Sequence, residues 1–282
     1  MRRFTDLLLA AVAACCGLVA TGLLVGLVAV IAARGAPAMD WSFFTEQVRL
    51  AGAAGGILWN LVGTLILLAT ACGFCTPPAV ALALWERVWL RNERSRRWLR
   101  TALYAANGIP SILFGLCGYI LFVQKLGWGK SWLAGGLVLG FMMLPTVTLA
   151  FVERLRAIPP KYPEAAAAIG LNRTQQVWAV LIPQARGGLI TGTLLGLARA
   201  AGETAPILFT ATIFAGATFP DGIRDSPVLS LPYHIFILAQ DSFDPAVGTR
   251  VWGAALVLLA LVFALSLVAL PGRLRQHEES HD

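Results

Sequence analysis

Long runs of predominantly apolar residues constrain this sequence more than any other feature. The first run, residues 7–31, has 25 residues, and a helix of about 20 suffices to cross a bilayer. Over the whole chain 57% of the residues are hydrophobic and only 13% are charged. A soluble fold could not cover so much apolar surface, because its exterior must face water. The sequence therefore predicts an all-α, polytopic membrane protein.

The positions of the apolar runs predict six transmembrane helices in a single domain, residues 1–282. The apolar segment 229–240 has 12 residues and is too short to cross, so we expect it to be re-entrant or interfacial. The first span is longer than the apolar core of a signal peptide, which favours a retained anchor. The predicted spans are residues 7–31, 57–84 (interrupted by Pro77 and Pro78), 102–123, 132–152, 188–215 and 251–270.

Basic residues predict the orientation of these spans. Six spans put both termini on one side, and cytoplasmic termini would place 15 of the 22 Lys and Arg residues in inner segments. The positive-inside rule favours that arrangement. The net charge of +7 is then explained by topology and by contact with anionic membrane lipid. It does not require a nucleic-acid partner.

Neither a metal site nor an ATPase site is expected. Cys72 and Cys75 have C-x-x-C spacing, but a zinc site needs two further ligands, and the five cysteines all lie in or beside apolar runs. We interpret them as helix-packing residues. The segment 129–131 ends like a phosphate-binding loop, yet Gln124 occupies the position of its required first glycine.

Two charged residues stand inside the predicted fifth span. Arg199 and Glu203 are four residues apart, so they lie on one helix face within pairing distance. Charged groups at bilayer depth are unfavourable and usually face a partner or a water-filled cavity. Arg199 offers a planar guanidinium suited to oxyanions, and Thr204 follows directly. We predict that these residues border a translocation path; the alternative is a structural ion pair that joins two helices.

Small residues share the face of that charged pair. Gly188, Gly192, Gly196, Arg199 and Glu203 fall within a sector of about 80° on a helical projection. The repeated four-residue spacing of glycine allows close approach of another helix. We therefore predict a packing seam at the glycines, continuous with the ion pair.

A second unusual stretch begins near the predicted third span, at residues 107–115. Pro110 and Ser111 stand among small residues, and broken helices in membranes generally line cavities. The alternative is an ordinary proline kink.

The inner loop 153–187 carries a family resemblance. It contains Glu164, Ala165 and Ala166, then Gly170, and closes with Val180-Leu181-Ile182-Pro183. This pattern resembles the EAA loop of ATP-binding-cassette (ABC) importer permeases. The resemblance implies the type I importer fold and a short coupling helix, containing Glu164, Ala165 and Ala166, that docks on an ATPase subunit, with Gly170 turning the chain after it. Pro183 would mark the return to the membrane.

Further segments resemble the permeases of the high-affinity phosphate importer. They are Gly188–Gly192, Ala198–Pro206 with Arg199 and Glu203 in it, and Ile109–Gly115, while Ser230-Leu231-Pro232 is more similar to PstA-type than to PstC-type subunits. The resemblance implies a non-catalytic permease subunit of a bacterial inner membrane that binds no cofactor itself. Its expected partners are a PstC-like permease, two PstB-like ATPase subunits that use ATP, and a periplasmic PstS-like phosphate-binding protein. Alternatives are an importer of another oxyanion, such as phosphonate or sulfate, or an ion-coupled secondary anion transporter.

Overall fold

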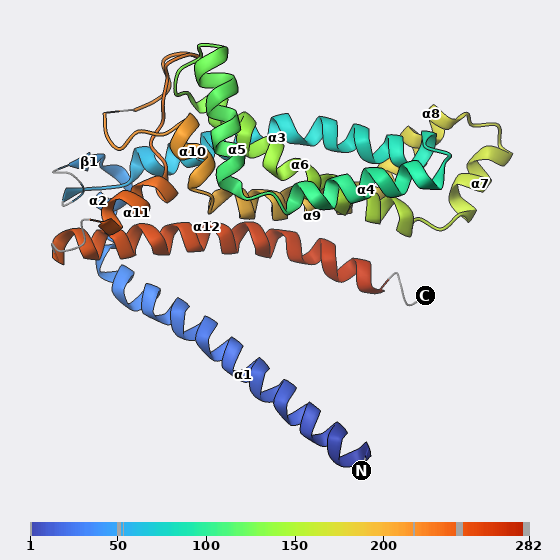
Figure 1. Cartoon of the computed structure of the whole chain (residues 1–282), viewed down its shortest axis with the longest axis horizontal. Coiled ribbons are helices and arrows are strands. Elements are labelled where there is room, and N and C mark those ends of the chain that lie inside the picture. Colours follow the sequence, from blue (N-terminus) through green and yellow to red (C-terminus); the bar gives the residue numbers. More distant parts are fainter. Residues whose placement is uncertain (1, 50–51, 53, 217, 241–244, 279–282) are drawn as a thin grey trace.

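A computed structural model of the chain describes residues 2–49, 52, 54–216, 218–240 and 245–278. Helices dominate these residues, and two strands of two residues each, β1 (Val48–Arg49) and β2 (Ala54–Gly55), form a small antiparallel hairpin. The long helices run along the long axis of the molecule (Figure 1). The all-α expectation is thus met apart from this hairpin.

The helices follow one another with short connections. In chain order they are α1 (Arg2–Gly35), η1 (Ala36–Ala38), α2 (Trp41–Thr45), α3 (Leu58–Leu84), η3 (Trp85–Trp89), α4 (Glu93–Asn107), α5 (Ser111–Gly118), η4 (Tyr119–Lys125), α6 (Trp132–Ala157), α7 (Lys161–Ala168), α8 (Arg173–Gln176), η5 (Val177–Leu181), α9 (Ile182–Ala201), α10 (Ala205–Thr210), α11 (Leu231–Gln240) and α12 (Pro245–Glu278).

Among the described residues, four helical stretches are long and apolar enough to cross a membrane. They correspond to the predicted spans 7–31, 57–84, 132–152 and 251–270. A fifth is obtained if the bent pair 93–107 and 111–125 counts as one span. The short segment 229–240 forms α11, a helix of 10 residues.

Two of the six predicted spans differ from the structure. The predicted span 102–123 is bent by 91° between α4 and α5, because Pro110 and Gly108 interrupt the helix there. The predicted span 188–215 is divided into α9 and the short α10, and residues beyond Thr210 leave the helix. In contrast, α3 continues through Pro77 and Pro78, where an interruption was predicted.

Helix α6 forms the centre of the bundle, with 72% of its apolar window buried. Small residues let its neighbours approach closely. A Cβ atom added at Gly140 of α6 would lie 2.8 Å from the Phe74 ring of α3, and one added at Gly192 of α9 would lie 2.7 Å from the Ala150 Cβ atom of α6. Cys75 of α3 is fully buried in this core, as expected of a packing residue, whereas Cys15, Cys16 and Cys117 are exposed on this chain and do not pack within it.

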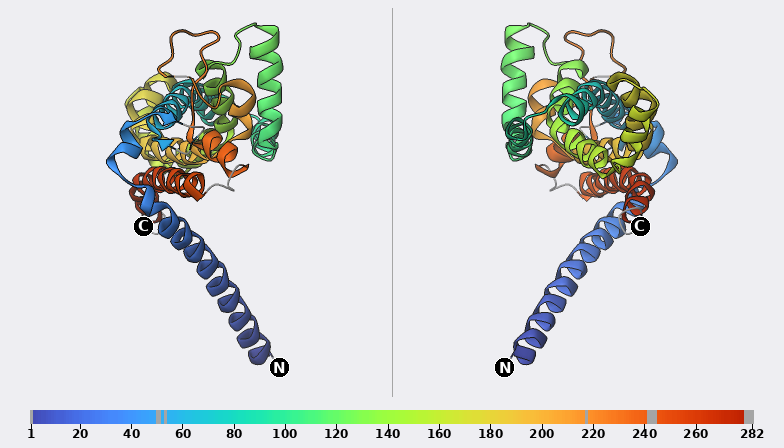
Figure 2. Two further views of the ribbon diagram at one scale, coloured as in Figure 1. Left: turned by 90° about the vertical axis from the view of Figure 1, so that its left-hand side faces the viewer. Right: turned by 90° about the vertical axis from the view of Figure 1, so that its right-hand side faces the viewer.

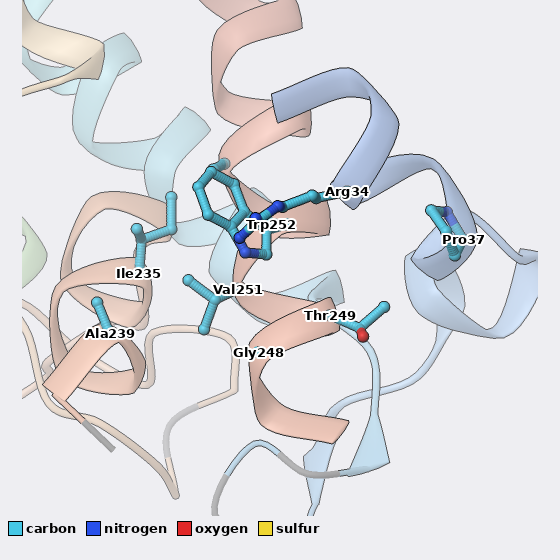
Figure 3. A pocket seen from close by; sticks show the side chains of 9 residues that line it. Arg34, Pro37, Ile235, Ala239, Gly248, Thr249, Val251 and Trp252 are labelled. Atoms are coloured by element: carbon cyan, nitrogen blue, oxygen red, sulfur yellow. The ribbon is translucent and has the colours of Figure 1, made fainter. Parts of the chain in front are cut away.

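Helix α1 extends away from the bundle, and none of its apolar window is buried in this chain (Figure 2). Only its last turn is fixed. Gly35 packs on the backbone of Trp252 in α12, and the Arg34 guanidinium lies 5.3 Å from the Trp252 ring centroid. Arg34 and Trp252 border a cavity of about 770 Å³ between η1, α11 and α12 (Figure 3). The attachment of α1 therefore depends on one close glycine contact and one cation–π contact.

Gly63 of α3 offers a direct test of this packing. A Cβ atom there would lie 1.9 Å from the Leu229 carbonyl oxygen, whereas Gly73 of the same helix has open space. We expect Gly63→Ala to lower the free energy of unfolding by about 1–3 kcal/mol, because the backbone must shift. Gly73→Ala is the matched control and should leave it unchanged or slightly higher. Equal unfolding midpoints in detergent for the two variants would contradict this packing.

Candidate functional site

Arg199 and Glu203 form an ion pair where α9 ends. Arg199 lies in the last turn of α9, and Glu203 follows the C-terminal Gly202 and precedes α10. The Arg199 Nε atom is 3.7 Å from the Glu203 Oε1 atom. Each charge thus lies where the nearest helix dipole stabilises it, the cation at a C-terminus and the anion before an N-terminus.

The pair is accessible from outside this chain. The Arg199 side chain is 39% exposed and that of Glu203 is 21% exposed, and within the described residues neither side chain has a hydrogen bond to a third residue. The guanidinium therefore keeps donors available for another group. The structure connects these two charges across the end of α9, because Glu203 lies beyond the helix that carries Arg199, so the predicted common helix face is not formed.

Three glycines of α9 precede this pair along the helix. Gly188, Gly192 and Gly196 are buried against α6, where added Cβ atoms would lie 2.4 Å from Arg154 Cβ, 2.7 Å from Ala150 Cβ and 3.1 Å from Met143 Cε. Further along α6, Gly140 faces α3 instead. Ala200 and Ala201 at the end of α9 still belong to one buried cluster with Leu139 and Met143 of α6, whereas the neighbouring Arg199 side chain is 39% exposed.

The chain between α9 and α10 satisfies its backbone locally. The amides of Gly202 and Glu203 donate to the carbonyls of Arg199 and Ala200, both at 3.2 Å. Thr204 begins α10 without a side-chain cap. At the far end of α10, the Lys130 ammonium donates to the carbonyls of Leu208 (3.0 Å) and Thr212 (3.3 Å). An irregular backbone is tolerated at membrane depth only with such partners.

A second helix break lies between α4 and α5. Pro110 is exposed, and Ser111 begins α5 half-buried. The Asn107 Oδ1 atom accepts a hydrogen bond of 3.0 Å from the Thr146 hydroxyl of α6, one residue after Pro145. This contact fixes the end of α4 to α6 and leaves the Ser111 hydroxyl for other partners.

Helices α5 and α10 bring the two breaks into one region. A Cβ atom added at Gly115 of α5 would lie 2.8 Å from the Ala205 carbonyl oxygen, and one added at Gly118 would lie 3.2 Å from Thr210 Cγ2. Ser111 is one turn before Gly115, and Ala205 is two residues after Glu203. The packing of α5 on α10 therefore brings the segment at Ser111 near the segment that follows Glu203, while Arg199 lies on α9.

The predicted coupling loop forms the helix α7 and a tight turn. Glu164 and Ala165 are exposed on α7, and Ala166 is buried. Gly170 has φ +86°, and the amides of Gly170 and Leu171 donate to the carbonyls of Ala167 and Ala166. This is a Schellman C-cap, which favours glycine at the left-handed position. Gly170 therefore ends the helix as predicted.

Pro183 lies inside a continuous helical segment. The helix resumes at α8, with a capping box between Asn172 and Gln175, and continues through the π-helical turn η5 into α9. Pro183 occupies the first turn of α9. The helical segment that leads out of the loop thus begins about ten residues before Pro183. The wider, π-helical turn η5 that precedes Pro183 accommodates the missing proline amide.

Two apolar side chains project from this region of the loop. Ile169 is 78% exposed and Trp178 is 68% exposed. Together with the exposed Glu164 and Ala165, they give α7 and η5 an exposed surface that is partly charged and partly apolar. Exposed aromatic and aliphatic groups of this size commonly mark a contact with another protein.

Some polar residues of the structure were not predicted from the sequence. Lys130 caps α10, Asn107 binds Thr146, and Glu86 is buried beside two arginines. Each of these three contacts joins residues that are distant in sequence, so no local sequence pattern identifies the contact. The cavity near Arg34 lies where α1 ends and α12 begins, and neither Arg199 nor Glu203 lines it. No metal-binding group of three or more His, Cys, Asp or Glu occurs among the described residues.

Comparison with known families now identifies the architecture. Residues 79–274 match the family described as binding-protein-dependent transport system inner membrane component. The chain belongs to this family. The match contains α4 to α11 and most of α12, and therefore both helix breaks and the α7 loop.

Curated relatives in this transport family support the resemblance to PstA-type permeases. The chain is 33% identical to the phosphate transport system permease protein PstA 2 of Mycobacterium bovis, covering 97% of this chain and 88% of the relative. It is 32% identical to PstA of Xylella fastidiosa, covering 84% and 81%. A probable ABC transporter permease protein of Bacillus subtilis, YqgI, is 28% identical, covering 95% of each chain. The predicted resemblance to PstA-type permeases is confirmed.

Solved structures of similar fold are ABC transporter permeases. A chain of the inward-facing MetNI methionine ABC transporter has a TM-score of 0.59 at 17% identity, covering 79% of this chain and 97% of that one. A chain of an amino acid ABC transporter has a TM-score of 0.51 at 16% identity, covering 78% and 92%. At this level of identity the likeness concerns the fold, which is that of the type I importer permeases.

Gly170 provides a test of the loop geometry. We expect Gly170→Ala to destabilise the end of α7 by about 1–2 kcal/mol, because an L-residue is disfavoured in the left-handed region. Hydrogen exchange of the amides from Ile169 to Leu171 should accelerate. Gly187→Ala is the control, since Gly187 lies within a helix with open space around it. Unchanged exchange in Gly170→Ala would show that the Schellman turn does not hold α7.

Proposed function

We propose that this ABC importer permease subunit forms half of a path for inorganic phosphate across the bacterial inner membrane. The observation that carries the proposal is the Arg199 guanidinium, which is 39% exposed at a broken helix and paired only loosely, at 3.7 Å, with Glu203. A guanidinium binds phosphate oxygens with two parallel hydrogen bonds. The PstA relatives named above support phosphate as the anion.

The ion pair suits transport better than tight binding. Without an anion, Glu203 neutralises Arg199 and lowers the cost of a charge at membrane depth. When phosphate arrives, it competes with Glu203 for the guanidinium, and the carboxylate then weakens binding by repulsion. Release on the inner side is thereby favoured. Thr204, Ser111 and the backbone near Pro110 supply neutral groups beside this exchange.

A second, PstC-like permease would complete the path. The uncovered face at Arg199 and the extended helix α1 both present surface that this chain leaves open. A periplasmic phosphate-binding protein would deliver the anion, and two ATPase subunits would bind at α7. Both ends of the described chain point toward the α7 end of the molecule (Figure 1), which supports cytoplasmic termini if α7 meets the ATPase there.

Phosphate uptake at low external concentration tests the path. In cells lacking the native gene, the intact chain should restore uptake of labelled phosphate. Arg199→Ala should reduce uptake by about 100-fold, since a charge-assisted contact of roughly 3 kcal/mol is lost. Arg186→Ala is the control, because Arg186 is exposed on the first turns of the same helix. Membrane insertion of each variant is measured by immunoblotting.

The same uptake assay distinguishes phosphate from the alternative anions. Excess phosphonate or sulfate should compete little with labelled phosphate. If phosphate uptake does not depend on this chain, and deletion of the chain abolishes uptake of another anion, the path is assigned to that other anion. Near-normal phosphate uptake by a well-inserted Arg199→Ala variant would refute a role for the guanidinium.

Coupling to the ATPase is tested at Glu164. We expect Glu164→Lys to reduce co-purification of the ATPase subunit and transport-coupled ATP hydrolysis by about tenfold, because a reversed charge enters the docking surface. Glu46→Lys makes the same change at the opposite end of the molecule, after α2, and should have no effect. Unchanged association and hydrolysis in Glu164→Lys would show that the ATPase docks elsewhere.

A further inference from the structure

A buried carboxylate lies at the end of α3, outside the proposed path. Glu86 is 1% exposed and belongs to the π-helical turn η3. Its Oε1 atom accepts hydrogen bonds from Arg100 Nε (3.1 Å), Arg100 Nη2 (3.0 Å) and Arg156 Nη2 (2.5 Å). A buried ionised carboxylate is tolerated only when it is paired in this way.

This cluster joins three separate helical segments. Glu86 follows α3, Arg100 is on α4, and Arg156 is in the last turn of α6. The neighbouring Arg87 Nε atom donates to the Leu155 carbonyl at 3.3 Å. Glu86 and Arg87 of η3 therefore both bind the end of α6, and Glu86 also binds α4.

The second carboxylate oxygen gives the cluster an alternative arrangement. Glu86 Oε2 is buried, and no described residue donates a hydrogen bond to it. Both arginines share Oε1, so either guanidinium could move to Oε2 without leaving the carboxylate. Two arrangements of similar energy are what a switching contact requires.

The segments on either side of the cluster lead to the two functional regions. Arg156 is followed by Ile158 and then by α7, the predicted ATPase contact. In the other direction, α4 runs from Arg100 to Asn107, which is held to α6 by Thr146 and ends at the break before α5. Because α4 is a continuous helix, displacement at Arg100 is transmitted to that break.

We propose that Glu86 is a positioning residue that couples the α7 loop to the helix break beside the path. When α7 moves with the ATPase, the end of α6 moves Arg156, and the shared carboxylate transfers the displacement to Arg100 and α4. The break at residues 108–110 then reorients α5 against α10. This role rests on the proposed coupling of α7 to an ATPase.

The test uses the complete transporter co-purified with its ATPase and second permease. Hydrogen exchange at residues 105–113 is compared with and without ATP. The intact protein should show an ATP-dependent change there, and Glu86→Gln should lose it, because a neutral amide lacks the negative charge that balances the two guanidinium groups. Phosphate transported per ATP hydrolysed should fall about tenfold in Glu86→Gln, while the ATPase still co-purifies. Glu93→Gln is the control, since Glu93 is 66% exposed on α4 and lies 3.7 Å from Arg96.

A triple variant separates positioning from simple stabilisation. Glu86→Met with Arg100→Met and Arg156→Met replaces the cluster by apolar packing, which commonly preserves folding. We expect this variant to assemble yet to remain uncoupled. Restored coupling in the triple variant, or an ATP-dependent exchange change that persists in Glu86→Gln, would overturn the proposal. Because the exchange measurement needs no transported anion, it tests Glu86 even if phosphate is not the substrate.

Discussion

Close packing of α6 against α3 and α9 is the constraint on which the rest of the structure depends. Gly140 admits Phe74 on one side, and Gly192 admits Ala150 on the other. Within a bilayer, association of helices relies on such contacts, because apolar surface gains little by leaving lipid. The seam fixes α9 relative to α6 up to Gly196. Beyond it, Ala200 and Ala201 stay in the buried core while the neighbouring Arg199 side chain is exposed.

The interrupted helices follow from this geometry. Chain breaks after Asn107 and after Ala201 would expose backbone amides and carbonyls to lipid. Local hydrogen bonds satisfy several of these groups: the amides of Gly108 and Ile109 donate to the carbonyls of Ala105 and Ala106, and those of Gly202 and Glu203 donate to the carbonyls of Arg199 and Ala200. An anion path between two such permeases can then present a guanidinium at membrane depth.

Sequence patterns predicted most of the long helices. Gly170 was predicted correctly because a Schellman turn depends on adjacent residues. The bent pair α4–α5 and the division of α9 from α10 were predicted as single spans, because apolar length does not reveal a bend. Glu86 with Arg100 and Arg156 escaped prediction altogether. Their separations are 14 and 70 residues, and the three residues lie on different helical segments, so only tertiary packing brings them together.

Accessibility of the α9–α10 junction tests the central claim most directly. Gly202→Cys would be placed in a chain whose five native cysteines are replaced, since a Cβ atom there meets only the Arg199 carbonyl oxygen at 3.8 Å. In the assembled transporter, a charged, membrane-impermeant thiol reagent should label this cysteine, and phosphate should slow the reaction. Gly22→Cys, in the middle of α1, should stay unlabelled. An unreactive Gly202→Cys, or a rate that no anion changes, would contradict a path at Arg199.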